Sequence, residues 1–311
     1  MDCKTFVEEQ VASIREKVGA ATAINALSGG VDSSLVTVLG HQALADKLKT
    51  VFVDSALMRK DEPQRVVELF AGMGINVELV DARREFLSAL AGLTDPEEKR
   101  HAVTDTFYSK VFARLVKESN AKFLLHGTIL TDIEETVAGI KRQHNILEQV
   151  GIDPQRNFGY SVIEPLKTLR KDGVREVADF LGLPPEISRR IPFPGPALAA
   201  RIVGEVTPER LELIRSATAI VEQELSDSGA FQYLAVLLND RATGIRNNKR
   251  EFGHIIVVRC IESADARTAT PTPLDWDRLN RICARITEEI DGVSRCLYDL
   301  TPKPPATIEY I

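Results

Sequence analysis

The segment that most constrains the fold is "INALSGGVDSSLVTVLG", residues 24–40, in which two glycines separate two apolar runs. The first run is typical of a short buried strand, and the second has the spacing of a helix packed on a sheet. Gly29 and Gly30 permit a tight turn and a close approach of a ligand to the backbone. A helix that begins near Asp32 directs its free N–H groups and its positive dipole end at this turn. The pattern predicts a phosphate-binding turn after a buried strand.

The phosphate turn lacks the sequence of the two commonest nucleotide-binding loops. A Walker A loop carries Lys and then Ser or Thr after its last glycine, and a dinucleotide fingerprint reads G-x-G-x-x-G. Residues 28–34 read S-G-G-V-D-S-S instead. They resemble the PP-loop of the ATP pyrophosphatases, which cleave ATP between its α- and β-phosphates. The alternative is a glycine-rich turn that only links strand to helix.

The PP-loop resemblance implies a set of ATP contacts and a metal ion. Serine hydroxyls and backbone amides of such a loop hold pyrophosphate as it leaves, and Asp32 is placed to bind magnesium. The ATP-binding residues implied within the loop are Ser28, Gly29, Gly30, Val31, Asp32, Ser33 and Ser34.

Strand and helix patterns alternate from residue 4 to residue 181. Helices are expected at 4–18, 32–44, 62–73 and 172–181, and strands at 23–27, 49–54, 75–80 and 121–127. This alternation predicts an α/β fold with a parallel, doubly wound sheet, in which ligands bind at the carboxyl ends of the strands. Gly29, Asp54, Gly127 and Thr128 fall at such ends. Val53, Gly127 and Thr128 are predicted to contact ATP.

A proline-rich stretch divides the chain. Five prolines between Pro184 and Pro196 interrupt the regular pattern. Beyond Arg201 the pattern becomes that of a small α+β domain, with helices at 208–226 and 279–290 and strands at 234–238, 254–261 and 294–299. We predict a nucleotide domain over residues 1–190 and a second domain over 191–311. A small sheet with exposed edges favours self-association of the second domain.

Composition narrows the class of protein. The 39 basic and 45 acidic residues give a net charge of −6, which argues against a nucleic-acid partner. The four cysteines form no C-x-x-C and no metal-ligand spacing, so free thiols in a reducing compartment are expected. We find neither a signal peptide nor an apolar run long enough to cross a membrane, and we therefore expect a cytoplasmic protein without a membrane partner.

Further motifs resemble the GMP synthetase family along nearly the whole chain. They are "VFVDSALMR", "DPEEKR", "HGTILTDIEET", "PFPGPALAAR" and "YDLTPKPPATIEYI". The ending K-P-P-A-T-I-E is the most specific, because other PP-loop enzymes such as NAD synthetase share the loop but not this ending. The resemblance implies a PP-loop domain of the adenine nucleotide alpha-hydrolase type, followed by a smaller α+β domain for dimerisation and substrate binding.

The same resemblance implies the amination of xanthosine monophosphate (XMP) to GMP. In this family ATP adenylates the purine O2, ammonia then replaces AMP at C2, and AMP and pyrophosphate are released. The chain starts at the helix before the PP-loop and so resembles the separate synthetase subunit of the archaeal two-subunit type. The implied partners are a glutaminase (glutamine amidotransferase) subunit that supplies ammonia and a second copy bound through the C-terminal domain.

The implied site residues outside the PP-loop form two groups. Asp132, Glu135 and Lys141 match the family's mobile lid, which closes over the adenylating centre and excludes water. Composition alone would instead make them a solvated helix face. The residues that match the XMP site are Arg100, Lys303, Ile308 and Glu309. The closing motif also suits a tail docked in a dimer interface.

Two departures from the family pattern and two alternative functions stay open. Ala197 and Ala199 stand where the family has glycine, and residues 243–250 replace a glycine-containing loop. One alternative function is another PP-loop amide ligase such as NAD synthetase, which the terminal motif disfavours. The other is a catalytically silent nucleotide-binding regulator, which the intact loop and lid residues disfavour.

Overall fold

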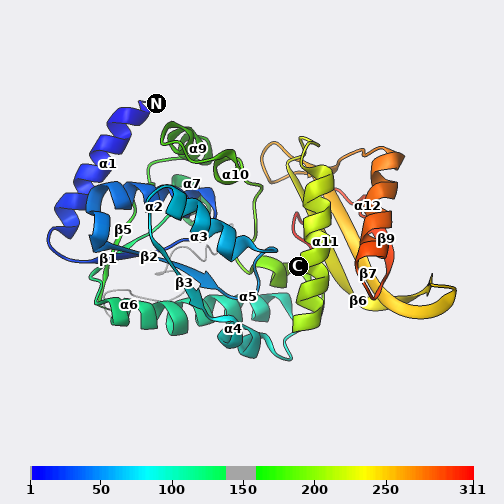
Figure 1. Ribbon diagram of the computed structural model, residues 1–311. Coiled ribbons are helices and arrows are strands. Elements are labelled where there is room, and N and C mark those ends of the chain that lie inside the picture. The colour runs from blue at the N-terminus through cyan, green and yellow to red at the C-terminus, as the bar shows by residue number, and fades with distance from the viewer. Residues whose placement is uncertain (1, 138–158) are drawn as a thin grey trace. The chain divides into compact units, whose positions relative to one another are not determined.

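The computed structural model describes residues 2–137 and 159–311 (Figure 1). The chain forms two compact units. Unit 1 comprises Met1–Asp54, Asp61–Ala82 and Asp105–Arg190, and unit 2 comprises Ser55–Lys60, Arg83–Thr104 and Ile191–Ile311. The sequence predicted two continuous domains divided after residue 190. That division stays a prediction, and in the structure unit 2 also contains the earlier segments Ser55–Lys60 and Arg83–Thr104.

The two early segments belong to unit 2 because their polar groups bond to residues beyond position 190. The Leu57 carbonyl accepts a hydrogen bond from Leu198 N–H at 3.0 Å, and the buried Lys99 donates to the Ile202 carbonyl at 2.7 Å. Bonds between residues so distant in sequence leave no local pattern. Continuous boundaries are therefore what the sequence alone predicts.

Unit 1 is built on a five-stranded parallel sheet in the order β3-β2-β1-β4-β5, which confirms the predicted α/β fold. The strands are β1 (Ala23–Ala26), β2 (Leu48–Asp54), β3 (Val77–Asp81), β4 (Phe123–Leu125) and β5 (Ser161–Ile163). The sequence pattern does not predict β5. The strand order reverses between β1 and β4, which is where open α/β sheets bind ligands.

Helices cover both faces of the sheet in unit 1. They are α1 (Cys3–Val18), α2 (Val31–Leu44), α3 (Glu62–Gly72), α6 (Ala113–Ser119), α7 (Leu130–Val137), α9 (Lys171–Phe180) and α10 (Pro185–Ser188), with the short 3-10 helix η1 (Ala45–Lys47) and the π-helix η2 (Thr106–Phe112). Figure 1 shows α1, α2, α3 and α9 on one face and α6 on the other. The fully buried Ile24, Leu35, Leu39 and Phe52 lie in the core of this unit and fix α2 and its preceding turn on the sheet.

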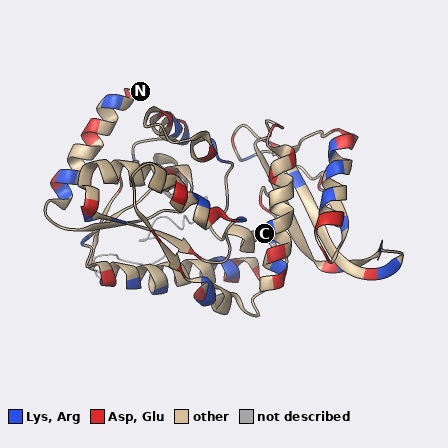
Figure 2. Cartoon of the chain, in the orientation of Figure 1, with Lys and Arg blue, Asp and Glu red and all other residues tan. Residues whose placement is uncertain are grey.

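Unit 2 combines a small mixed sheet with helices. Its elements are α4 (Arg83–Leu90), α5 (Pro96–Asp105), η4 (Ala197–Arg201), α11 (Pro208–Leu225), β6 (Gln232–Arg246), β7 (Lys249–Glu262), β8 (Thr270–Pro271), α12 (Trp276–Glu289) and β9 (Val293–Tyr298). Strands β6 and β8 run antiparallel to β7, and β9 runs parallel to it. Figure 2 shows acidic and basic residues interspersed along α11 and α12. Ion pairs such as Arg285–Glu224 at 3.0 Å join these two helices.

Residues 243–250, which replace a glycine-containing loop of the family, form the end of a long hairpin. Strands β6 and β7 extend to Arg246 and from Lys249, so only Asn247 and Asn248 form the turn. Both residues have positive φ, at 49° and 57°. Two adjacent left-handed residues define the type I′ turn, which favours asparagine and matches the twist of paired strands. The departure from the family pattern in this segment therefore forms an ordered hairpin without glycine at its tip.

Two findings bear on environment. Within residues 2–137 and 159–311, no helix combines the length and apolarity needed to cross a membrane. The four cysteines all lie among the described residues and form no disulfide; Cys260 is buried, and Cys3, Cys283 and Cys296 are half-buried.

Candidate functional site

The PP-loop is held in shape by its own serines at the start of α2. Ser28 N–H donates to Ser33 Oγ at 3.1 Å, and the two hydroxyl oxygens lie 2.9 Å apart. The Ser33 hydroxyl also lies 3.1 Å from the Gly30 carbonyl, to which it donates. Gly30 is the N-cap of α2, and the first N–H groups of a helix have no intrahelical partners. Hydroxyls and amide donors thus gather at one helix end, an arrangement that suits a phosphate.

Gly29 is required by both backbone conformation and space. Its φ is +75°, and a Cβ at this position would lie 2.7 Å from Arg190 Nη1. That nitrogen donates to the Gly29 carbonyl at 2.6 Å, and the same guanidinium pairs with the buried Glu62. Arg190, the last residue of unit 1 in the sequence, therefore holds the backbone of the PP-loop in place.

Asp32 carries the features of a magnesium ligand. Its Oδ2 accepts from Lys171 Nζ at 2.6 Å, whereas its Oδ1 is buried and has no hydrogen-bond partner among the described residues. An unpartnered carboxylate oxygen is unfavourable unless something binds it, and carboxylate oxygen is a preferred ligand of Mg²⁺. The residues present therefore fit the ion that the PP-loop resemblance implies.

Gly127 lies directly against the PP-loop. A Cβ on Gly127 would be 3.3 Å from the backbone of both Asp32 and Ser33, a tighter contact than side chains normally make. The neighbouring Thr128 is 1% exposed, and its hydroxyl bonds to His126 Nδ1 at 2.8 Å. Burial lowers the pKa of His126, so the imidazole is neutral at pH 7 and serves as a structural hydrogen-bond partner.

Four of the predicted ATP contacts have buried side chains. They are Val31, Ser34, Val53 and Thr128, and the Ser34 hydroxyl has no hydrogen-bond partner among the described residues. The exposed or half-buried residues of the loop are Ser28, Gly30, Asp32 and Ser33.

The predicted lid residues fall at and beyond α7. The Asp132 carboxylate accepts from Ile129 N–H at 3.1 Å, which caps the start of this helix. Glu135 follows three residues later on the same helix. Lys141 lies outside the described residues. The shared lid role of the three residues stays a prediction.

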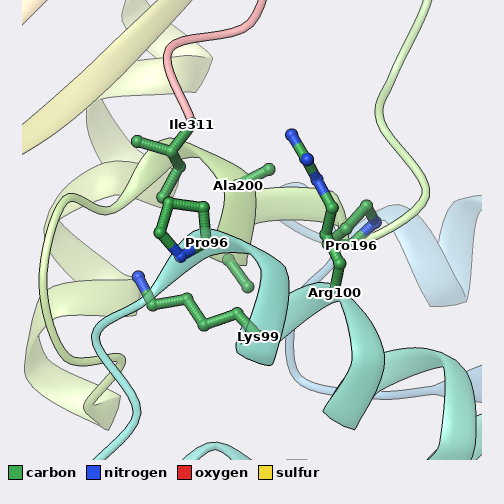
Figure 3. A pocket seen from close by; sticks show the side chains of 7 residues that line it. Pro96, Lys99, Arg100, Pro196, Ala200 and Ile311 are labelled. Atoms are coloured by element: carbon green, nitrogen blue, oxygen red, sulfur yellow. The ribbon is translucent and has the colours of Figure 1, made fainter.

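Arg100 lines a small pocket within unit 2. Figure 3 shows Ile311 and Pro96 on one side of this pocket and Arg100 and Pro196 on the other. Arg100 also pairs with Glu97 one turn earlier on α5. The pocket brings a half-exposed guanidinium close to the end of the K-P-P-A-T-I-E motif. Lys303 lies elsewhere, where its ammonium donates to the Ala266 carbonyl at 2.8 Å.

Lys99, the neighbour of Arg100 in this pocket, is 1% exposed. Its ammonium donates to the Ile202 carbonyl at 2.7 Å. Burial, aided by the positive charge of Arg210, lowers the pKa of Lys99 to about 8. The charged form is therefore less favourable in the folded chain than in the unfolded one.

The shifted pKa of Lys99 predicts a pH-dependent stability. Below pH 8 both states carry the charge, and the folded state bears the full cost of burying it. Between pH 8 and 10.5 the unfolded state binds more protons, so the free energy of unfolding rises by up to about 3 kcal/mol. We expect the free energy of unfolding of wild type, measured with urea across that range, to rise relative to that of Lys99→Met. Lys117→Met, which removes an exposed lysine, is the reference variant. The prediction is contradicted if wild type differs from the two variants by the same pH-dependent amount.

Two buried arginines order the C-terminal segment. Arg259 is fully buried and donates to the carbonyls of Thr301, Thr307 and Ile308 and to the Asp299 carboxylate. Burial alone would raise the pKa of Asp299, but hydrogen bonds from Thr301 and the Arg259 charge lower it below its usual value. Ile308, predicted as an XMP contact, is thus fixed through its backbone carbonyl.

The predicted XMP contact Glu309 is held by the second arginine. Arg201 donates from Nη2 to Oε1 at 3.2 Å and from Nε to Oε2 at 3.3 Å, and Gln232 donates to Oε1 at 2.6 Å. The guanidinium carbons of Arg201 and Arg59 both lie over the Phe193 ring, 4.8 Å and 3.8 Å from its centroid. Arg201 therefore joins the motif "PFPGPALAAR" to the C-terminal segment.

The alanines of that motif have different consequences. Ala197 has φ +53°, in the left-handed region that favours glycine, and a non-glycine residue there costs about 1–2 kcal/mol. Ala199 is fully buried within η4. The departure at Ala197 is thus accommodated with backbone strain, while Ala199 only adds a buried methyl group.

Four polar residues at these sites were not predicted from the sequence. They are Lys171, Arg190, Arg201 and Arg259. Each bonds to a residue that is at least 40 positions away in sequence. Arg201 closes the motif "PFPGPALAAR", and its place in that motif was the signal that could have identified it.

Known proteins match this chain along its whole length. The family model "GMP synthase C terminal domain" matches residues 219–310, and "NAD synthase" matches residues 2–127. A protein from Archaeoglobus fulgidus, named as a subunit of GMP synthase [glutamine-hydrolyzing], is 54% identical, with both chains covered completely. The subunits of the same name from Pyrococcus horikoshii and Methanopyrus kandleri are 48% and 47% identical, covering 100% and 99% of each chain.

A solved structure also matches part of the chain. The NH3-dependent NAD synthetase from Campylobacter jejuni superposes with a TM-score of 0.48 and 16% identity, over 62% of this chain and 80% of that one. The relatives matched over their full length decide the family. The chain belongs to the family of these GMP synthase [glutamine-hydrolyzing] subunits.

Proposed function

We propose that this chain catalyses the synthetase half of GMP formation, in which ATP adenylates O2 of XMP and ammonia then displaces AMP at C2. The observation that carries the proposal is the PP-loop at the start of α2, where Asp32 offers a buried, unpartnered oxygen beside amide and hydroxyl donors. The sequence identity of 54% and 47%, over 100% and 99% of this chain, to proteins named as GMP synthase subunits supports the proposal.

Unit 1 provides the groups that release of pyrophosphate requires. Negative charge that grows on the leaving group needs donors and cations fixed in advance. The Ser28 and Ser33 hydroxyls and the amides of α2 supply donors. Lys171 supplies a cation, which pairs with Asp32 at 2.6 Å. Asp32 would also hold Mg²⁺, which adds positive charge beside the phosphates.

Unit 2 provides the groups that hold XMP. Oxide and hydroxide are poor leaving groups, so O2 of XMP must be adenylated before ammonia can replace it at C2. XMP has to be held in place while this adenylation occurs. The Arg100 guanidinium, 34% exposed in its pocket, suits a phosphate group bidentately. The terminal segment with Lys303, Ile308 and Glu309 is proposed to hold the nucleoside.

The relatives are named as subunits, which implies that this chain too has a partner subunit. We propose that this partner is a glutaminase that delivers ammonia, and that two copies of this chain associate through unit 2. Exposed apolar side chains of unit 2 favour the second association, since Ile245, Phe252 and Leu297 are 76%, 65% and 47% exposed. These three residues lie on the hairpin and on β9.

The nitrogen source tests the proposed function. Glutamine hydrolysis requires an activated nucleophile, usually Cys beside His. Burial raises the pKa of Cys260, and it raises that of Cys296 to about 12, so both thiols stay protonated at pH 7. We expect the chain alone to form GMP from XMP, ATP and ammonium but not from glutamine. Adding a glutaminase subunit should restore the use of glutamine, and turnover with glutamine alone would contradict this division of labour.

The NAD synthetase alternative is weaker. The NAD synthase model matches only residues 2–127, whereas the GMP synthase model matches residues 219–310, which include the ordered terminal segment. Replacing XMP with deamido-NAD in the ammonium assay discriminates the two activities. We expect no amidation of deamido-NAD.

A further inference from the structure

We propose that Arg201 is a positioning residue for XMP: it acts through Glu309 and holds that carboxylate where the nucleotide binds. The inference rests on the proposed function, because it presupposes that Glu309 contacts XMP. Arg201 itself is 1% exposed and cannot offer its guanidinium to a ligand in solvent. Glu309, with 20% of its side chain exposed, is the member of the pair that a ligand can reach.

The geometry of the pair fixes the carboxylate in direction as well as in place. Both carboxylate oxygens of Glu309 accept from different nitrogens of Arg201, at 3.2 and 3.3 Å. Two parallel bonds from a planar fork prevent the carboxylate from rotating, which a single ammonium would not do. Gln232 adds a third donor at 2.6 Å to Oε1. The carboxylate is thus held in one orientation before a ligand binds.

The carboxylate keeps capacity for a ligand. Two carboxylate oxygens offer about four acceptor positions. The described contacts use two on Oε1 and one on Oε2, which leaves Oε2 able to accept one more hydrogen bond. The xanthine base and the ribose of XMP both carry N–H or O–H donors. A donor on the nucleotide is therefore the partner that the remaining position would take.

Arg201 is itself held so that it can act as a fixed support. Its guanidinium lies over the Phe193 ring at 4.8 Å, and Arg59 lies on the same ring at 3.8 Å. Arg59 is in turn paired with Glu222 at 2.5 Å. A chain of contacts therefore runs from α11 through Phe193 to Glu309. These contacts restrict movement of the Arg201 guanidinium and therefore also of the Glu309 carboxylate that it binds.

The test is the KM for XMP in ammonium-dependent GMP formation. Replacing Arg201 with methionine removes two charge-assisted hydrogen bonds while keeping apolar volume, and we expect the KM for XMP to rise about tenfold or more. The KM for ATP should stay within about twofold of wild type. Arg201→Lys, which restores the charge without the fork, should recover part of the loss.

A double variant separates action through Glu309 from any other role. If Arg201 works through Glu309, adding Arg201→Met to Glu309→Gln should raise the KM for XMP little beyond that of Glu309→Gln alone. Multiplying losses would overturn the inference, because they would show that Arg201 acts by another route. Arg278→Met is the matched control, since Arg278 also forms a bidentate pair in unit 2, with Asp227 at 3.0 and 3.1 Å. Its KM for XMP should match wild type.

Hydrogen exchange gives a readout that does not involve turnover. In the absence of XMP, the amides of residues 306–311 should exchange faster in Arg201→Met than in Arg278→Met. If Arg201→Met does not fold, Arg201→Lys takes its place with an expected severalfold rise in KM for XMP. A wild-type KM for XMP in the folded Arg201 variant overturns the positioning role. Failure of the wild-type chain itself to form GMP would instead overturn the proposed function.

Discussion

Asp32→Asn is expected to lower the rate of ammonium-dependent GMP formation by about a hundredfold or more. The substitution keeps the size of the side chain but removes the charge that would bind Mg²⁺ and that pairs with Lys171 at 2.6 Å. Loss of one electrostatic contact to the transition state typically costs a factor of about 100–1,000 in rate. The measurement is kcat for GMP, with thermal unfolding recorded for the same protein.

The folding of the Asp32→Asn chain should change little, since Asp32 lies at the start of α2 rather than in the core. Asp46→Asn, an exposed change of the same kind in η1, serves as the control. Lys171→Met should also reduce kcat, because it removes the cation expected to meet the pyrophosphate. Wild-type turnover in Asp32→Asn would refute the role assigned to the PP-loop carboxylate.

Arg259→Met is expected to destabilise unit 2 by about 3–5 kcal/mol, the usual cost of removing one partner of a buried ion pair. Four described acceptors lose their donor: the Asp299 carboxylate, at 2.7 Å from Nη1, and the carbonyls of Thr301, Thr307 and Ile308. The pKa of Asp299 should move upward once the positive charge is gone, because Arg259 is one of the groups that lower it. The measurement is the urea midpoint and Tm of the full chain.

The same variant should also raise the KM for XMP, since Arg259 holds the backbone that leads to Glu309. Arg285→Met, on the α11–α12 surface, breaks ion pairs that are more exposed and should cost less than about 1 kcal/mol. If Arg259→Met and Arg285→Met lower the free energy of unfolding equally, burial of the Arg259 guanidinium does not increase its contribution to stability.

The sequence predicted those parts of the site that are contiguous in the chain. The PP-loop reads directly from residues 28–34, because a strand, a glycine turn and a helix follow one another without interruption. The α/β sheet follows from the alternation of apolar runs, and the structure confirms it. Glu309 was predicted as an XMP contact because the terminal motif resembles that of the GMP synthetase family.

The partners of those residues could not be predicted in the same way. Lys171 and Arg190 are 139 and 161 positions from the loop atoms that they contact. A lone Lys at a helix start or an Arg after a proline has many ordinary structural roles, so spacing alone does not identify it. Folding brings these cations to Asp32 and Gly29, and only the three-dimensional arrangement shows it.

The interleaving of the two units has a consequence for synthesis on the ribosome. All the residues of unit 1 exist once Arg190 has been made, but Ser55–Lys60 and Arg83–Thr104 have by then been translated and belong to unit 2. Their acceptor and donor groups, Leu57 and Lys99 among them, find partners only after residues 198–202 emerge, and Arg201 meets Glu309 only at the end of translation. A gene fragment that encodes residues 191–311 alone would therefore yield a polypeptide with an unfilled core, and this unit cannot be exchanged between enzymes as a single cassette.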